Sequence, residues 1–391
     1  MQNTPPPLRA WQVISGGIAG LVLTIGLARF AYTPLLPLMQ AQAGLSDLAA
    51  GALAATNYLG YMSGALLAAW LEDPVWRHRL YGWGLLLALA STALMAASSE
   101  LWLWALSRYL GGLTGAAGML LGSGLVLGWL MRAGRRPELG LHFMGLGLGV
   151  AVSALGAMLM TRLQLPWAGQ WLGFALLGLP LLALAWRWRP PVPPPAVAAQ
   201  ATPGPGRRWL GLMAAMYFCA GWGFVISATF TVAIVERQPQ LAGQGPWAWL
   251  LVGLAATPAV FLWDRVARLI GDLNALLLAF GLQLVSVLLP ALSGSLAAAL
   301  AGALLYGATF IGLVSLTLAL VGRRSPGNPG KAMARLTLSY GLAQVSAPAL
   351  AGGMAQASGS YQAALWLTAA VLALGMVLLA LLRREERRAA P

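Results

Sequence analysis

Apolar stretches of about 18 or more residues recur along the whole chain, separated by short polar segments. The hydrocarbon core of a bilayer requires about 20 apolar residues per helical span. These stretches are apolar on all sides, whereas transmembrane strands alternate apolar and polar positions over about ten residues. The pattern predicts an all-α integral membrane protein whose twelve transmembrane helices begin near Val13, Leu48, Leu80, Leu101, Leu139, Trp167, Trp209, Trp247, Leu273, Leu296, Ala332 and Tyr361.

The composition agrees with this prediction, since 59% of the residues are hydrophobic and 9% are charged, against about 25% charged in soluble domains. The net charge of +14 raises nucleic-acid binding as an alternative, which the distribution of the basic residues excludes. With a cytoplasmic N-terminus, twenty of the 24 Lys and Arg fall in inner loops, and only Arg162 and Arg237 in outer loops. We therefore expect a multi-pass protein of the cytoplasmic membrane with both termini in the cytoplasm.

The first helix resembles a signal peptide, because Arg9 precedes an apolar run. A cleavage site with small residues is not apparent before Arg29, so we expect an uncleaved first helix.

A stretch rich in proline and alanine, "RPPVPPPAVAAQATPGPG", follows the sixth span and cannot form a helix. It predicts a cytoplasmic linker over 189–208 between two six-helix bundles, 1–188 and 209–391.

The two halves also repeat each other at an offset of 195 residues, which maps Gly26 onto Gly221 and Gly112 onto Gly307. Two pseudo-symmetric six-helix bundles around a site at the membrane midplane are typical of alternating-access carriers.

Two arginines, Arg29 and Arg108, lie inside predicted spans, each about 12 Å below the outer face. An ionised side chain at bilayer depth costs at least about 2.5 to 3.5 kcal/mol. The ten acidic residues all fall in loops or at helix ends, so none provides a counter-charge at the midplane. We therefore expect both guanidinium groups to bind a carboxylate or phosphate of an anionic substrate. Alternatively, Arg108 binds backbone carbonyls at a broken helix, and Arg29 snorkels or meets Glu236.

The second half is chemically different at the corresponding positions. The offset maps Arg29 onto Phe224 within the aromatic run "YFCAGWGFVISATF", which also contains Tyr217 and Trp222. A cationic first half facing an aromatic second half suggests an anion with an apolar or aromatic body. The alternative is that these rings pack against other helices or lipid.

Uncharged polar residues inside the predicted spans complete the predicted binding site. Asn57 and Tyr61 are four residues apart on one helix face, Tyr32 follows Arg29 by three residues, and Gln344 lies in the eleventh span. Such residues also serve simply as hydrogen-bonding groups between helices.

A family resemblance is carried by several motifs. "SRYLGGLTGAA" (107–117) fits the Arg-x3-Gly-x3-Ala pattern of the major facilitator superfamily. "WLEDPVWRHRL" (70–80) and "LWDRVARLIGD" (262–272) resemble degenerate copies of its cytoplasmic motif. "GLARFAYTPLLPLM", "LWDRVARLIG" and "GLAQVSAPALAGGMAQASGS" are similar to the YbfB/YjiJ branch over essentially the full length.

The resemblance implies a secondary transporter whose first and fourth helices line a central cavity. It also implies a gating role for Asp73 and Arg77 after the second helix, and a cytoplasmic ion-pair latch made by Asp264, Arg265 and Arg268. Positive-inside anchoring is the alternative for the arginines, but it does not explain Asp264.

The predicted function is alternating-access transport of a small organic anion or amphiphilic metabolite by a monomer without a cofactor. We find neither HExxH, which argues against an enzyme, nor GxxxxGK[ST], so a gradient is the expected energy source. A proton or a counter-anion is the expected coupling partner, with Glu236 and Asp47 as coupling candidates near the outer mouth.

Two further functions stay open. The aromatic second half fits an exporter of hydrophobic, drug-like compounds. Met213, Met216 and the only cysteine, Cys219, recur every three residues and fit a carrier of a soft metal such as Cu(I).

Overall fold

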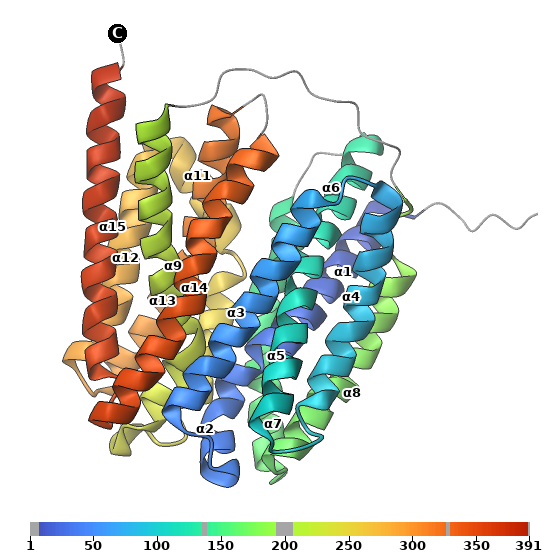
Figure 1. Ribbon diagram of the computed structural model, residues 1–391, viewed down its shortest axis with the longest axis vertical. Helices are drawn as coiled ribbons and strands as arrows, with labels where there is room; N and C mark the ends of the chain where they lie inside the picture. The colour runs from blue at the N-terminus through green and yellow to red at the C-terminus, as the bar shows by residue number, and fades with distance from the viewer. Residues whose placement is uncertain (1–7, 135–138, 193–205, 326–328, 390–391) are drawn as a thin grey trace, which may run out of the picture.

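The computed structural model describes residues 8–134, 139–192, 206–325 and 329–389, and within these ranges the regular structure is helical throughout (Figure 1). The first half contains α1 (Ala10–Leu21), η1 (Val22–Phe30), α2 (Tyr32–Ala43), α3 (Asp47–Trp70), α4 (Pro74–Leu94), α5 (Leu101–Ala116), η2 (Ala117–Gly122), α6 (Ser123–Arg132), α7 (Leu139–Arg162) and α8 (Trp167–Arg187). The second half contains α9 (Arg207–Glu236), η3 (Pro239–Leu241), α10 (Gly245–Ala256), α11 (Ala259–Ile270), α12 (Asp272–Leu292), α13 (Leu296–Arg324), α14 (Pro329–Ser358) and α15 (Gln362–Ala389). Joined across breaks inside a span, they form the twelve predicted segments.

Eight helices in the described ranges are long and apolar enough to cross a membrane, or nine if the pair α10 and α11, bent by 50°, counts as one span. The remaining three segments of the twelve are α3, α4 and α14. Two of them, α3 and α14, pack along each other at the centre of the molecule. Because these two helices face protein over much of their length, they need fewer apolar side chains than helices surrounded by lipid.

Helices of the first half gather on one side of the molecule and helices of the second half on the other (Figure 1). The halves contact each other through α3 with α14, α7 with α10, and α2 with α9. Adding the 195-residue offset to α3 gives α10, and subtracting it from α14 gives α7. The contact between α3 and α14 thus corresponds to the contact between α10 and α7. The interface therefore repeats itself, as the internal repeat predicts. Residues 193–205, most of the predicted linker, lie outside the described residues.

The start of α1 and the end of α8 lie together, since the rings of Trp11 and Trp188 are 5.2 Å apart. We call this the terminal end of the molecule, because the described chain begins there and α15 also ends on this side (Figure 1). The opposite end, where α2 ends and α3 begins, is the distal end.

The first segment, Ala10–Ala43, contains a π-helix, η1, in its middle. A π-helical turn displaces carbonyl oxygens from the regular i to i−4 pattern, and such turns often occur at functional sites. η1 carries Arg29. A second π-helix, η2, lies in the segment that contains Arg108 in α5.

Candidate functional site

A cavity of about 600 Å³ lies between the two halves. Residues of η1, α3, η2 and α7 line it from one side, and residues of α9, α13 and α14 from the other. The lining runs from Arg29, in the middle of the first segment, to Arg323 at the terminal end of α13. Arg323 is exposed, so the cavity reaches the surface at the terminal end. Its walls are mostly apolar.

Arg29 is 6% exposed and lies among aromatic rings. Its Cζ is 4.3 Å from the ring centre of Tyr58, 4.9 Å from that of Tyr61 and 5.9 Å from that of Phe224. Such contacts stabilise a desolvated cation by about 2 kcal/mol. Among the described residues no ion pair includes Arg29, and its buried Nε has no hydrogen-bond partner. The guanidinium group therefore faces the cavity with its charge uncompensated.

Arg108 is 3% exposed and does not line the cavity. Its Nη1 donates to the carbonyl oxygens of Ala28 (3.3 Å) and Arg29 (3.1 Å), at the end of the π-helix. Its Cζ lies 4.4 Å from the ring centre of Tyr32. Arg108 thus binds backbone carbonyls at an irregular helix, the arrangement that the sequence left open as the alternative to substrate binding.

The second half repeats this contact with a neutral side chain. Tyr306 donates its hydroxyl to the carbonyl oxygen of Phe224 at 3.0 Å, and Phe224 is the offset counterpart of Arg29. In each half, a side chain from the fourth segment therefore holds the same backbone position of the first segment. A tyrosine suffices for this in the second half, so the contact itself does not require a charge.

The other predicted binding residues divide into two groups. Those that line the cavity are Tyr61, Tyr217, Phe224 and Gln344. Those that do not line it are Tyr32, whose hydroxyl donates to Ala50 O (3.0 Å), Asn57, whose Nδ2 donates to Arg108 O (2.7 Å), and Trp222, which packs on Phe218 with ring centres 6.0 Å apart.

Two aromatic rings of the cavity lining, Phe310 and Tyr340, were not predicted. Phe310 lies 5.4 Å and Tyr340 lies 5.9 Å from Phe224 between ring centres, and Tyr340 lies 4.5 Å from Tyr217. The available signal was helical spacing, because Tyr340 precedes Gln344 by four residues and therefore shares its helix face. That spacing alone does not reveal which face of a buried helix meets a cavity.

At the distal end, Asp47 connects the two halves. Its Oδ1 forms an ion pair with Arg237 and accepts hydrogen bonds from the Tyr361 hydroxyl (3.1 Å) and from Gln40 Nε2 (2.7 Å). One turn later, Gly51 approaches the Pro348 carbonyl so closely that a Cβ atom would collide with it. The cavity is closed on this side.

The second coupling candidate, Glu236, has a local role in the structure. Its carboxylate accepts hydrogen bonds from the backbone N–H groups of Gly243 and Gly245, both at 2.8 Å. Both oxygens therefore stabilise the loop that follows α9, within the second half.

The predicted gating residues lie at the terminal end and form only local contacts. Asp264 and Arg268 make an ion pair of 2.7 Å within α11, and both are exposed, as is Arg265. Asp73 caps α4 by accepting from Val75 N (2.7 Å), and Arg77 is exposed. Within the described ranges, no ion pair of these residues joins the halves.

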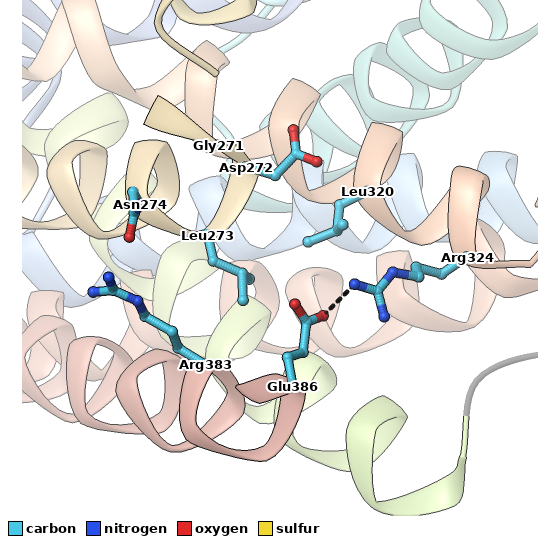
Figure 2. A pocket seen from close by; sticks show the side chains of 8 residues that line it. All are labelled: Gly271, Asp272, Leu273, Asn274, Leu320, Arg324, Arg383 and Glu386. Atoms are coloured by element: carbon cyan, nitrogen blue, oxygen red, sulfur yellow. Dashed lines mark ion pairs between the residues drawn. The ribbon is translucent and has the colours of Figure 1, made fainter. Parts of the chain in front are cut away.

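A second, shallower pocket of about 400 Å³ lies at the terminal end of α12, α13 and α15 (Figure 2). An ion pair of 2.8 Å between Arg324 and Glu386 crosses it, and Arg383 points toward Asn274 on its other side (Figure 2). This pocket lies entirely within the second half and holds none of the predicted substrate residues.

Met213, Met216 and Cys219 are buried in α9 and do not line the central cavity. Among the described residues, His, Cys, Asp and Glu form no group of three or more that could hold a metal ion.

The family described as "Uncharacterised MFS-type transporter YbfB" matches residues 21–380. No curated protein sequence matches the chain.

Solved structures match over nearly the whole chain. A mutant of the nucleoside transporter NupG aligns with 95% of this chain and 99% of its own at 13% identity and a TM-score of 0.75. The POT family transporter PepTSo aligns over 98% and 99% at 13% identity and a TM-score of 0.74. The human organic anion transporter MFSD10 (TETRAN) aligns over 96% and 100% at 20% identity and a TM-score of 0.65. At these identities the likeness shows the fold alone, which is the major facilitator fold.

Proposed function

The chain belongs to the MFS-type transporter family described as YbfB, and from this premise we propose that it moves a small organic anion with an apolar body across the cytoplasmic membrane. Membership makes the chain a multi-pass membrane transporter rather than an enzyme, and the fold implies alternating access. The nature of the substrate is our inference from the cavity.

The observation that carries the proposal is the uncompensated charge of Arg29. Four rings surround its guanidinium group within 5.9 Å, and they replace part of its hydration without neutralising it. A ligand carboxylate would supply the missing charge through two parallel N–H···O bonds, which an ammonium group cannot form.

Hydroxyl groups around the same space favour an anion as well. Tyr61, Tyr217 and Tyr340 line the cavity, and in the described part of the chain none of the hydrogen bonds uses their hydroxyls. A phenol O–H donates readily to a carboxylate. We assign the direct contact to Arg29 and a supporting role to Arg108, which holds the backbone that carries Arg29.

We further propose that the terminal end faces the cytoplasm, as the positive-inside distribution predicts. The cavity then opens inward, and the Asp47–Arg237 pair closes the outer side. Of the two coupling candidates, Asp47 is the one whose partners must change when the outer side opens, because Arg237 and Tyr361 belong to the other half. Glu236 binds only its own loop.

An exporter of hydrophobic, drug-like compounds is the second candidate, favoured by the mostly apolar walls. It predicts binding of neutral or cationic dyes as well as anions. The anion proposal predicts that an uncharged analogue of a bound anion does not bind.

The test is uptake of organic anions into proteoliposomes by Arg29→Gln and Arg29→Lys variants. Loss of a charge-assisted contact of about 1.5 to 3 kcal/mol lowers affinity about 10- to 150-fold in Arg29→Gln, and Arg29→Lys retains part of it. Arg162→Gln, which removes an exposed arginine at the distal end, is the matched control. Wild-type uptake by Arg29→Gln contradicts the proposal.

A further inference from the structure

The central cavity offers one uncompensated positive charge. Of the residues that the structure describes, two arginines line it, Arg29 and Arg323. Arg323 is already paired with Asp272, with Nη2 and Oδ2 2.6 Å apart. Arg108 lies behind the wall and binds the backbone. No carboxylate is among the described residues that line the cavity, so in this part of the chain a bound ligand meets a single uncompensated charge of +1.

The cavity also contains a polar group without a partner in the second half. Gln344 on α14 is 3% exposed and lines the cavity, and its Oε1 has no hydrogen-bond partner in the described part of the chain. Leaving a buried amide oxygen unsatisfied costs about 1 to 3 kcal/mol. A ligand that donates a hydrogen bond would remove this penalty.

Aromatic rings connect the two polar positions. The Phe224 ring centre lies 5.9 Å from Arg29 Cζ and 5.9 Å from the ring centre of Tyr340. Tyr340 precedes Gln344 by one helical turn and lies 4.5 Å from Tyr217 between ring centres. The wall between Arg29 and Gln344 is therefore a continuous aromatic surface, which suits a flat ring system.

Resting on the proposed function, we infer that the substrate class is an aromatic monoanion with a hydroxyl group at the end opposite its carboxylate. The carboxylate binds Arg29 of the first half, the rings pack against Phe224 and Tyr340, and the hydroxyl donates to Gln344 of the second half. Such a ligand bridges the two halves. A second carboxylate is rejected because at the Gln344 end it would have no counter-charge and would lie against an amide oxygen that itself lacks a donor.

A matched bicyclic series tests each part of this inference on the purified wild-type protein. The probes are 6-hydroxy-2-naphthoate, 2-naphthoate, decalin-2-carboxylate, 2,6-naphthalenedicarboxylate and 2-naphthamide, with affinities measured by calorimetry. We expect 6-hydroxy-2-naphthoate to bind about three- to tenfold more tightly than 2-naphthoate, and decalin-2-carboxylate more weakly than 2-naphthoate. The dicarboxylate is expected to bind at least about a hundredfold more weakly than 2-naphthoate.

A Gln344→Met variant isolates the hydroxyl contact, because methionine has a similar volume and no hydrogen-bonding amide. Its affinity ratio between 6-hydroxy-2-naphthoate and 2-naphthoate is expected to fall to about one. The thermal midpoint of the variant shows that it is folded. An unchanged ratio overturns the assignment of Gln344.

The remaining outcomes separate this inference from the proposed function. If the dicarboxylate binds as tightly as 2-naphthoate, the single-charge inference is wrong while anion transport stands. If decalin-2-carboxylate binds as tightly as 2-naphthoate, the inference that the substrate has an aromatic body is wrong. If 2-naphthamide binds as tightly as 2-naphthoate, the proposed function itself fails.

Discussion

The distal and terminal ends of the molecule use similar side chains in different ways. Of the five ion pairs between described residues, only Arg237–Asp47, at the distal end, joins the two halves. The other four lie at the terminal end and within the second half: Arg208–Glu385, Arg268–Asp264, Arg323–Asp272 and Arg324–Glu386. The closed end is thus the one with a polar connection between the halves.

This difference explains how one set of helices forms a cavity that opens on one side only. Near the distal end, α3 and α14 touch through backbone at Gly51, and Gly352 likewise approaches the backbone of Asp47. At the terminal end, the charged side chains pair inside their own half and leave the gap between the halves open. An alternating-access carrier must interconvert between a state open at the terminal end and a state open at the distal end. The contacts that close either end therefore have to be individually weak.

The largest change is expected from a bulky side chain at Gly51, where α3 and α14 touch through backbone at the distal end. In Gly51→Val, the new side chain collides with the Pro348 carbonyl, and overpacking of this kind costs about 1 to 3 kcal/mol. The cost applies to the closed distal end and falls away when the halves separate there. The distal-open population should therefore rise about 5- to 150-fold.

The measurement uses a reporter cysteine at Ser315, which lines the cavity, in a Cys219→Ala background. A membrane-impermeant maleimide is applied from each side of oriented vesicles. Labelling of wild-type protein is expected from the terminal side, and Gly51→Val adds labelling from the distal side. Gly124→Val is the control, because a Cβ at Gly124 meets open space. Equal labelling patterns in the two variants would refute the role of the α3–α14 contact.

A smaller shift is expected from Asp47→Asn. The substitution removes the ion pair with Arg237 while the amide still accepts hydrogen bonds from Tyr361 or Gln40. The pair is partly exposed, with side-chain exposures of 33% and 12%, so we expect about 1 to 2 kcal/mol, between an exposed and a buried pair. Distal labelling of the same reporter should rise about 5- to 30-fold. No increase would show that packing alone closes the distal end.

The sequence predicted the fold well because the property that determines it, long apolar segments, is a local pattern. The helix starts at Leu101, Leu139, Trp167 and Leu296 agree with the prediction to the residue. The sequence also drew attention to Arg29, since an arginine in an apolar run requires a partner wherever the run lies. Its role in substrate binding stays a prediction.

The roles of Arg108 and Asp47 were harder to predict, because they depend on contacts between distant segments. Which of two buried arginines faces the cavity depends on the π-helix η1, whose displaced carbonyls accept from Arg108. The distal latch joins residues 190 positions apart, and no periodicity in the chain indicates that pairing. The resemblance also implies a gating role for Asp73, Arg77, Asp264, Arg265 and Arg268. That role stays a prediction for the state of the carrier in which the terminal end is closed.

The smallest change is expected from Asp264→Asn, the same substitution applied at the open end. The ion pair with Arg268 lies within one helix, and both side chains are more than half exposed, at 63% and 72%. Pairs of this kind contribute about 0.3 to 0.5 kcal/mol, and this one does not connect the halves. Labelling of the Ser315 cysteine from either side should therefore change by less than about twofold. A shift as large as that of Asp47→Asn would mean that Asp264 contacts the first half in a populated state, and the two ends would then be closed by equivalent latches.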